Sequence, residues 1–145
     1  MIRYLAFSGC LALTLFCISP KNVVAHEGDR VFHKCSHRLE ELTRNCVNNT
    51  REIVERCVPE IRALLHEGRV EEARALAHRC INRIEENTRR CNNAIQELCE
   101  RCIHRLIELE RPELAERFRN RCRKARRIIH HAAQTGIETI RNLFD

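Results

Sequence analysis

Regularly spaced cysteines constrain this 145-residue chain more than any other feature. Residues 35–57 and 80–102 each carry cysteines at intervals of 11 residues, and the two segments are identical at 12 of 23 positions. This similarity, at an offset of 45, predicts an internal duplication. Eleven residues make about three turns of α-helix, so the three cysteines of each segment lie along one helical stripe.

Cysteines on one stripe stand about 16 Å apart, so they cannot bond to one another within a helix. They can bond to a second helix that runs in the opposite direction. Facing residues of such a pair have numbers with a constant sum, and three cysteine pairs share the sum 137: Cys35–Cys102, Cys46–Cys91 and Cys57–Cys80. Their common centre falls between Gly68 and Arg69, where a turn is expected. We expect a pseudo-two-fold axis near the Cys46–Cys91 bond.

The two cysteines that remain, Cys99 and Cys122, centre between Glu110 and Arg111, beside Pro112. Their pairing predicts a second turn at that point and a third helix bonded to the second. The alternative is that the equal spacing only reflects duplication and that the cysteines pair differently. It stays open, because pairing cannot be deduced from the sequence alone.

The first 25 residues have the pattern of a cleaved signal peptide. Arg3 precedes an apolar stretch over residues 5–18, and Val23 and Ala25 place small residues at the −3 and −1 positions, which predicts cleavage after Ala25. The stretch is short for a membrane span, so an uncleaved anchor is the less favoured alternative. We expect the mature protein to have no transmembrane segment and to be secreted into the extracellular space.

Cleavage would leave residues 26–145 as a single disulfide-rich domain that contains both copies of the duplicated unit, residues 35–57 and 80–102. The leader carries Arg3 and Lys21 but no acid, so the formal net charge falls from +6 to +4. Two of the ten cysteines leave with it, and an even count of eight in an exported chain is typical of disulfides.

Composition favours an all-α fold. The 145 residues include only 4 glycines and 3 prolines, too few for the many turns of a β-sandwich or barrel. With the cysteine pairing, this predicts a disulfide-stapled antiparallel helical hairpin plus a third helix, in a three- to four-helix bundle. We expect the helices over about residues 29–67, over about residues 70–109 and from residue 112 onward, and Gly68 should end the first in a left-handed cap.

Two further signals concern the helix interiors. Pro59 predicts a kink or break over residues 55–58 of the first helix. Thr135 and Glu138 have the spacing of a capping box around Gly136, which predicts a short last helix to Phe144 that folds back.

Arginines crowd into the third predicted helix. Six of nine positions from 119 to 127 are basic and none is acidic. One helical flank collects the candidate anion- or partner-binding residues Arg119, Arg123, Arg126, Arg127 and His130. Such a stripe would attract sulfate, phosphate or acidic partners. The competing interpretation is a solvated face whose charges are neutralised by glutamates of the other helices.

Other sites give weaker signals. Asn48-Asn49-Thr50 forms a glycosylation sequon at Asn48. His33 and His37 have a spacing that can bind zinc, but no third ligand stands at an obvious spacing, so we predict no metal and no cofactor. The chain lacks a phosphate-binding glycine loop and a nucleophile elbow, so we predict that it is not an enzyme.

The sequence therefore predicts a secreted helical protein that binds an extracellular protein or receptor, as a salivary- or venom-type effector or a pheromone-like ligand. The alternative is a basic binder of anionic glycans or membrane surfaces that uses the arginine stripe. Nucleic acid is not expected as a partner, because aromatic residues for base stacking are scarce. A carrier of small apolar ligands would need a cavity that closely stapled helices are not expected to enclose.

Overall fold

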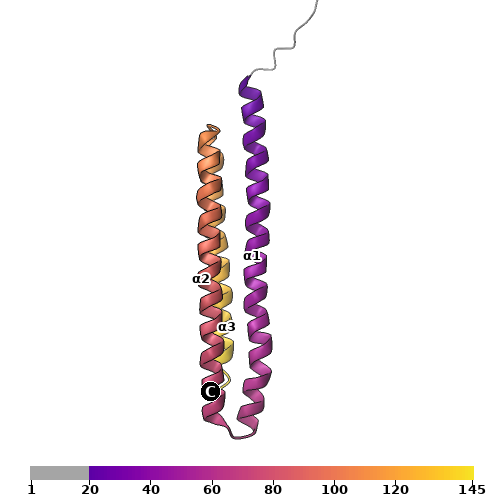
Figure 1. Ribbon diagram of the computed structural model, residues 1–145, viewed down its shortest axis with the longest axis vertical. Helices are drawn as coiled ribbons and strands as arrows, with labels where there is room; N and C mark the ends of the chain where they lie inside the picture. Colours follow the sequence, from indigo (N-terminus) through magenta and orange to yellow (C-terminus); the bar gives the residue numbers. More distant parts are fainter. Residues whose placement is uncertain (1–19) are drawn as a thin grey trace, which may run out of the picture.

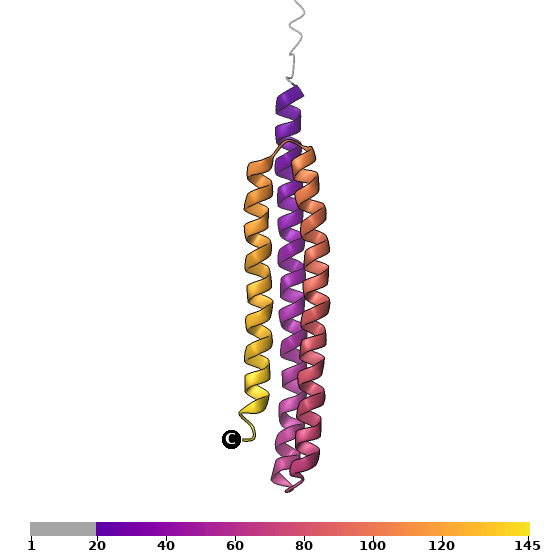
Figure 2. The same ribbon diagram turned by 90° about the vertical axis from the view of Figure 1, so that its left-hand side faces the viewer.

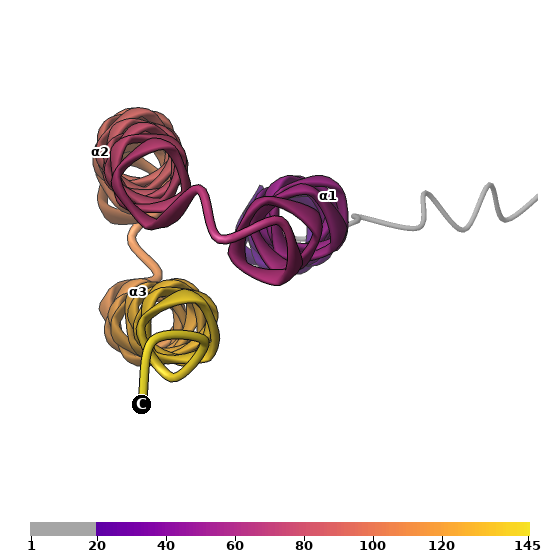
Figure 3. The ribbon, with the colours of Figure 1, turned by 90° about the horizontal axis from the view of Figure 1, so that it is seen from below.

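A computed structural model describes residues 20–145 of the chain, with side chains from His26 onward. These residues form three helices and no strand: α1 (Pro20–His66), α2 (Val70–Glu108) and α3 (Pro112–Arg141). The helices lie side by side along one rod (Figures 1 and 2) and occupy the corners of a triangle in end view (Figure 3). The predicted all-α class is confirmed as a three-helix bundle.

The predicted signal peptide lies outside the described residues as far as residue 19, and residues 20–25 form the first turns of α1. α1 therefore begins nine residues before the predicted start at Asp29, at a proline, which suits the first turn of a helix. In residues 20–145, no helix has a stretch both long and apolar enough to cross a membrane.

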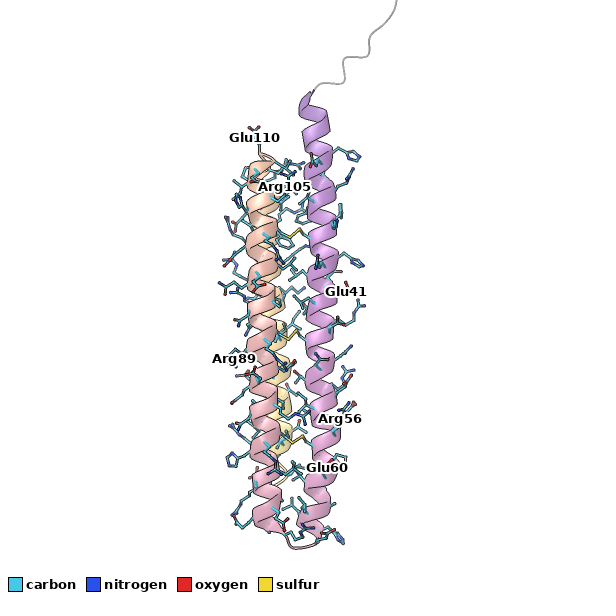
Figure 4. All side chains as sticks on the ribbon, in the orientation of Figure 1. Glu41, Arg56, Glu60, Arg89, Arg105 and Glu110 are labelled. Atoms are coloured by element: carbon cyan, nitrogen blue, oxygen red, sulfur yellow. A yellow bond between two sulfur atoms is a disulfide. The ribbon has the colours of Figure 1, made fainter. Side chains whose placement is uncertain are left out.

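In residues 20–145, four disulfides join the helices. Three of them connect α1 to α2, namely Cys35–Cys102, Cys46–Cys91 and Cys57–Cys80, and Cys99–Cys122 connects α2 to α3. The bonded Cα atoms lie 6.0–6.3 Å apart, and these are the pairs predicted from the spacing. Figure 4 shows the three S–S bonds crossing the α1–α2 interface like rungs. Within the described part of the chain, no disulfide joins α1 to α3.

Gly68 ends α1 in the predicted left-handed conformation, with φ of 75°. The Gly68 N–H donates to the Leu65 carbonyl at 3.0 Å, and the Arg69 N–H donates to the Leu64 carbonyl at 2.9 Å. These two bonds form a Schellman motif, which satisfies carbonyls that the end of a helix leaves without partners.

The α2–α3 turn repeats this motif without a glycine. Glu110 has φ of 54°, its N–H donates to the Ile107 carbonyl at 2.9 Å, and the Arg111 N–H donates to the Leu106 carbonyl at 2.9 Å. A side chain in the left-handed region costs about 1–2 kcal/mol. The second turn therefore has the same hydrogen bonds as the first but carries backbone strain.

Of the kink or break predicted over residues 55–58, the break is wrong, because α1 runs through these residues and Pro59 without interruption. Proline removes one backbone hydrogen bond, to the carbonyl of Glu55, and Glu55 is exposed to solvent. On either side of Pro59, the Cys57–Cys80 bond and the fully buried Ile61 fix α1 against its neighbours. The lost hydrogen bond is therefore tolerated.

The predicted short last helix is also wrong. α3 continues through Thr135 and Gly136 to Arg141. A Cβ at Gly136 would stand 3.0 Å from Val54 Cγ2 on α1 and 3.4 Å from Ile84 Cδ1 on α2. The glycine thus lets α3 approach both other helices closely, and it does not end the helix.

The core consists of two apolar clusters along the rod. The Phe118 cluster contains three disulfides and is built around Phe32, Leu39, Ile95, Leu98, Leu106, Leu114, Phe118 and Ile129. The Ile140 cluster contains the Cys57–Cys80 bond and is built around Ile61, Ala73, Ala77, Ile84, Ala133 and Ile140. The chain ends against it, with Leu143 and Phe144 packed on its edge.

A buried polar layer lies where the two clusters meet. Asn87 of α2 is 4% exposed and donates through Nδ2 to the Cys46 carbonyl at 3.2 Å and to Thr50 Oγ1 at 3.1 Å, both on α1. Thr50 Oγ1 in turn donates to the Cys46 carbonyl. These bonds give the buried Asn87 NH2 group two acceptors, and an unpaired amide donor would be costly to bury.

Two threonines at the offset of 45 residues make the same local bond. Thr43 Oγ1 donates to the Leu39 carbonyl at 2.7 Å, and Thr88 Oγ1 donates to the Ile84 carbonyl at 2.8 Å. The internal duplication and its pseudo-two-fold axis remain predictions from the sequence.

Candidate anion- and partner-binding face of α3

The arginine stripe lies on the solvent side of α3. Pro112 begins the helix, and its 30 residues keep one helical phase, so positions three and four apart share a face. Phe118, Cys122, Ala125 and Ile129 are buried on the inner face. The outer flank presents the exposed residues Arg119, Arg123, Arg126, Arg127 and His130, which we call the arginine stripe.

Most residues of the stripe lie along the edge of the α2–α3 interface. Arg119, Arg123 and Arg126 line a shallow groove of about 360 Å³ with Gln96 and Glu100 of α2. His130 lines a second groove further along the same interface, beside Asn92 and Asn93. A partner that contacts the stripe would therefore also contact the adjacent edge of α2.

The two ends of the stripe differ in charge. Glu116 accepts hydrogen bonds from Arg119 at 2.8 Å and from Arg123 at 3.5 Å, and Asn120 also accepts from Arg123. Arg126 and Arg127 have no ion-pair partner within residues 26–145. Positive charge is thus partly neutralised near Glu116 and is fully available at Arg126 and Arg127.

The sequence pattern did not predict the role of the opposite flank of α3. Arg117 and Arg121 place their guanidinium groups 5.0 and 5.4 Å from the centre of the Phe32 ring on α1. Arg121 also pairs with Glu40 at 3.1 Å. This glutamate lies 81 residues away in the chain, so only the fold brings the two together. The run of basic residues is therefore divided between two flanks of α3.

A groove of about 680 Å³ lies along this second flank, between α1 and α3. Leu39 and Ala125 form its apolar floor, and Ile128, which is 42% exposed, stands at its wall. In residues 20–145 no disulfide crosses this interface, and the groove is open to solvent. The expectation that stapled helices do not enclose a cavity for a small apolar ligand therefore stays a prediction. The groove is lined by Leu39, Glu40, Thr43, Arg44, Val47, Asn48, Arg51, Arg121, Lys124, Ala125 and Ile128.

Asn48 is exposed on α1, at the edge of this α1–α3 groove. The third sequon residue, Thr50, is only 3% exposed, and its hydroxyl belongs to the polar layer with Asn87. The folded chain therefore presents the asparagine but hides the threonine, so any glycosylation would have to precede folding. A glycan at Asn48 would stand beside the groove.

The histidines are spread over exposed surfaces, with His33 and His37 on α1 and His130 and His131 on α3. Within residues 26–145, no group of three or more histidine, cysteine, aspartate or glutamate side chains is arranged to hold a metal ion.

Charged groups at the α2–α3 turn connect it to the start of α1. Arg111 pairs with Asp29 at 3.2 Å and with Glu113, and Arg105 pairs with Glu27 at 3.0 Å. The hydrogen bond from Arg111 lowers the pKa of Glu113 below its usual value. Other charged side chains point outward along the rod, as Glu41, Arg56 and Arg89 do in Figure 4.

Comparisons with models of protein families, with curated proteins and with solved structures found no significant match. The candidate site therefore has to be interpreted from its own geometry and charge.

Proposed function

We propose that this chain is an exported, non-enzymatic binding protein that engages an extracellular protein partner or receptor through the arginine stripe of α3. In this role it would act as a salivary- or venom-type effector or as a pheromone-like ligand. Four disulfides support an oxidising compartment such as the extracellular space. A disulfide-linked rod can also present a helix face to a partner with little loss of conformational entropy on binding.

The observation that carries the proposal is the pair Arg126 and Arg127. Both are exposed and lack an acidic partner within residues 26–145, next to the cluster of Arg119, Arg123 and Glu116. Unpaired guanidinium groups are suited to bidentate bonds with carboxylates. Glu116 gives the stripe mixed charge and a defined register, which favours the patterned surface of a protein over a uniform polyanion.

The alternative is an anionic glycan or membrane surface bound by the same stripe. It predicts tight binding that weakens steeply as salt rises, because many exposed charges contribute together. Protein recognition through a mixed surface would tolerate moderate salt better.

A heparin salt series with the oxidised protein separates these two functions. The stripe variant changes Arg119, Arg123, Arg126 and Arg127 to Ala. The control variant removes the same charge elsewhere by changing Arg38, Arg62, Arg79 and Arg83 to Ala. We expect heparin binding to be lost near physiological salt in all three proteins. The glycan function would be favoured instead if the unchanged protein and the control variant still bound heparin well above physiological salt and the stripe variant did not.

Photo-crosslinking tests the protein partner directly. A photoreactive residue replaces Arg127 in one variant and Arg83 on α2 in the control, and each is exposed to extracellular fluid from the source organism. We expect one discrete crosslinked protein from position 127 and none from position 83. Equal patterns from both positions would contradict a partner-binding role for the stripe.

A further inference from the structure

The interface between α1 and α3 differs from the other two because no disulfide crosses it in residues 20–145. It is closed by packing at two points. Phe32 of α1 meets Phe118 of α3 edge to face, with ring centres 6.3 Å apart. Further along, Gly136 brings α3 against Val54 and Thr50. The α1–α3 groove lies between these two contacts.

Small side chains explain why the groove stays open. Thr43 and Val47 on α1 and Ala125 on α3 line the groove, and none of the three is larger than valine. The Phe32–Phe118 contact and the parallel course of the helices fix the distance between α1 and α3. The small residues cannot fill the space that remains between them. The floor is apolar, since Leu39 and Ala125 are buried there, and Ile128 adds apolar surface that solvent reaches.

The edges of the groove are strongly positive. Four cationic side chains line it, and the single carboxylate among its lining residues, Glu40, is already paired with Arg121. The other three cations have no ion-pair partner within residues 26–145: Arg44, Arg51 and Lys124. An apolar floor beneath three unpaired cations is complementary to a ligand with an apolar body and an anionic head.

We propose that the α1–α3 groove binds a single-chain amphiphile with an anionic head, of the fatty-acid carboxylate type. The chain would lie on Leu39, Val47 and Ile128, and the head would bond to Arg44, Arg51 or Lys124. From Leu39 to Arg51 the groove extends about 18 Å along α1, which suits one extended chain. The site occupies the flank of α3 opposite the arginine stripe, so it does not depend on the proposed function.

A fluorescence titration tests this site. The probe is dansyl-labelled undecanoate, whose emission rises when the dansyl group leaves water, and hexadecanoate is the unlabelled competitor. The protein is the oxidised chain with Asn48→Gln, so that no glycan stands at the groove. We expect saturable binding of one probe per chain and displacement by hexadecanoate. The methyl ester of hexadecanoate should compete about tenfold less well, because it lacks the charged head.

Two groove variants test the apolar and the charged part separately. Val47→Phe should fill the groove and weaken probe binding about tenfold or more, whereas Ile107→Phe, at an exposed apolar residue of α2 outside the groove, should not. The double change Arg44→Gln and Lys124→Gln should weaken binding of the acid but not of the ester. Removing the same charge with Arg62→Gln and Arg83→Gln, at exposed residues outside the groove, should leave both unchanged.

Several results would overturn the proposal. They are the absence of saturable binding, equal binding by Val47→Phe and the unchanged protein, or equal competition by the ester and the acid. The Arg44→Gln and Lys124→Gln variant alters only exposed side chains, so the test does not depend on the folding of Val47→Phe. Loss of probe binding together with intact partner crosslinking would separate this site from the arginine stripe.

Discussion

The two core clusters of this rod are held together by different means. Around the Phe118 cluster, covalent bonds link all three helices, because Cys35–Cys102 and Cys46–Cys91 join α1 to α2 and Cys99–Cys122 adds α3. Around the Ile140 cluster, a single bond joins α1 to α2, and α3 is held by packing alone. The second half of α3 therefore depends on shape complementarity, whereas the first half is cross-linked to α2.

The largest effect is expected from shortening Ile140, which is fully buried in the Ile140 cluster. Ile140→Ala should lower the free energy of unfolding by about 2–5 kcal/mol, through lost burial and a cavity that no cross-link keeps closed. Guanidinium unfolding under non-reducing conditions measures it. The matched control, Ile107→Ala at a residue that is 50% exposed, should cost far less. Equal costs would show that α3 does not depend on packing at this end.

The next effect concerns the bond that attaches α3. Changing Cys99 and Cys122 together to Ala should cost about 3 kcal/mol, since it restores chain entropy to the unfolded state. The matched control removes Cys57–Cys80, which has the same sequence separation of 23. Hydrogen exchange distinguishes the two variants. Loss of Cys99–Cys122 should raise amide exchange along all of α3, whereas loss of Cys57–Cys80 leaves α1 and α2 joined by two other bonds. Similar exchange of α3 in both would contradict this account.

Cysteine spacing predicted the hairpin because helical periodicity fixes which residues share a stripe, and an antiparallel pair fixes which residues face one another. Periodicity does not say how closely two helices approach. The capping-box spacing around Gly136 therefore predicts a helix start, whereas the glycine serves close packing against Val54. Pro59 predicts a kink or break over residues 55–58, but the helix continues because its surroundings tolerate one missing hydrogen bond.

The candidate site shows the same limit of predictions from helical periodicity. The sequence predicted a basic flank on α3 because residues three and four apart share a face. It did not predict that Arg121 meets Glu40 and Phe32 of α1, since those contacts depend on the lateral placement of distant helices. The α1–α3 groove was missed for the same reason. It arises from small residues on two helices that lie about 80 positions apart in the chain.

A smaller effect is expected at the polar layer between the clusters. Asn87→Ala should cost about 1–3 kcal/mol, because it removes a buried donor to the Cys46 carbonyl and to Thr50. Replacing both partners, with Asn87→Leu and Thr50→Val, should recover part of the loss by leaving fewer buried polar groups unpaired. Thermal unfolding of the two variants measures the difference. A neutral Asn87→Ala would show that this layer adds no stability.

The smallest effect is expected at the α2–α3 turn and has the opposite sign. Glu110→Gly should raise the free energy of unfolding by about 0.5–1 kcal/mol. Relief of the left-handed strain in the folded state is larger than the opposing effect of the entropy that glycine adds to the unfolded chain. Gly68→Ala at the other turn should destabilise by a similar amount. Denaturant titrations of both variants check the signs. Destabilisation by Glu110→Gly would contradict the strain assigned to this turn.

Native-state hydrogen exchange, resolved along α3, tests the central comparison most directly. The account predicts slow amide exchange at buried positions of residues 112–124, which include Cys122 of the Cys99–Cys122 bond. It predicts faster exchange in residues 125–141, which are held against the other helices by packing alone. Equal protection along the whole helix, or faster exchange near Cys122, would contradict it.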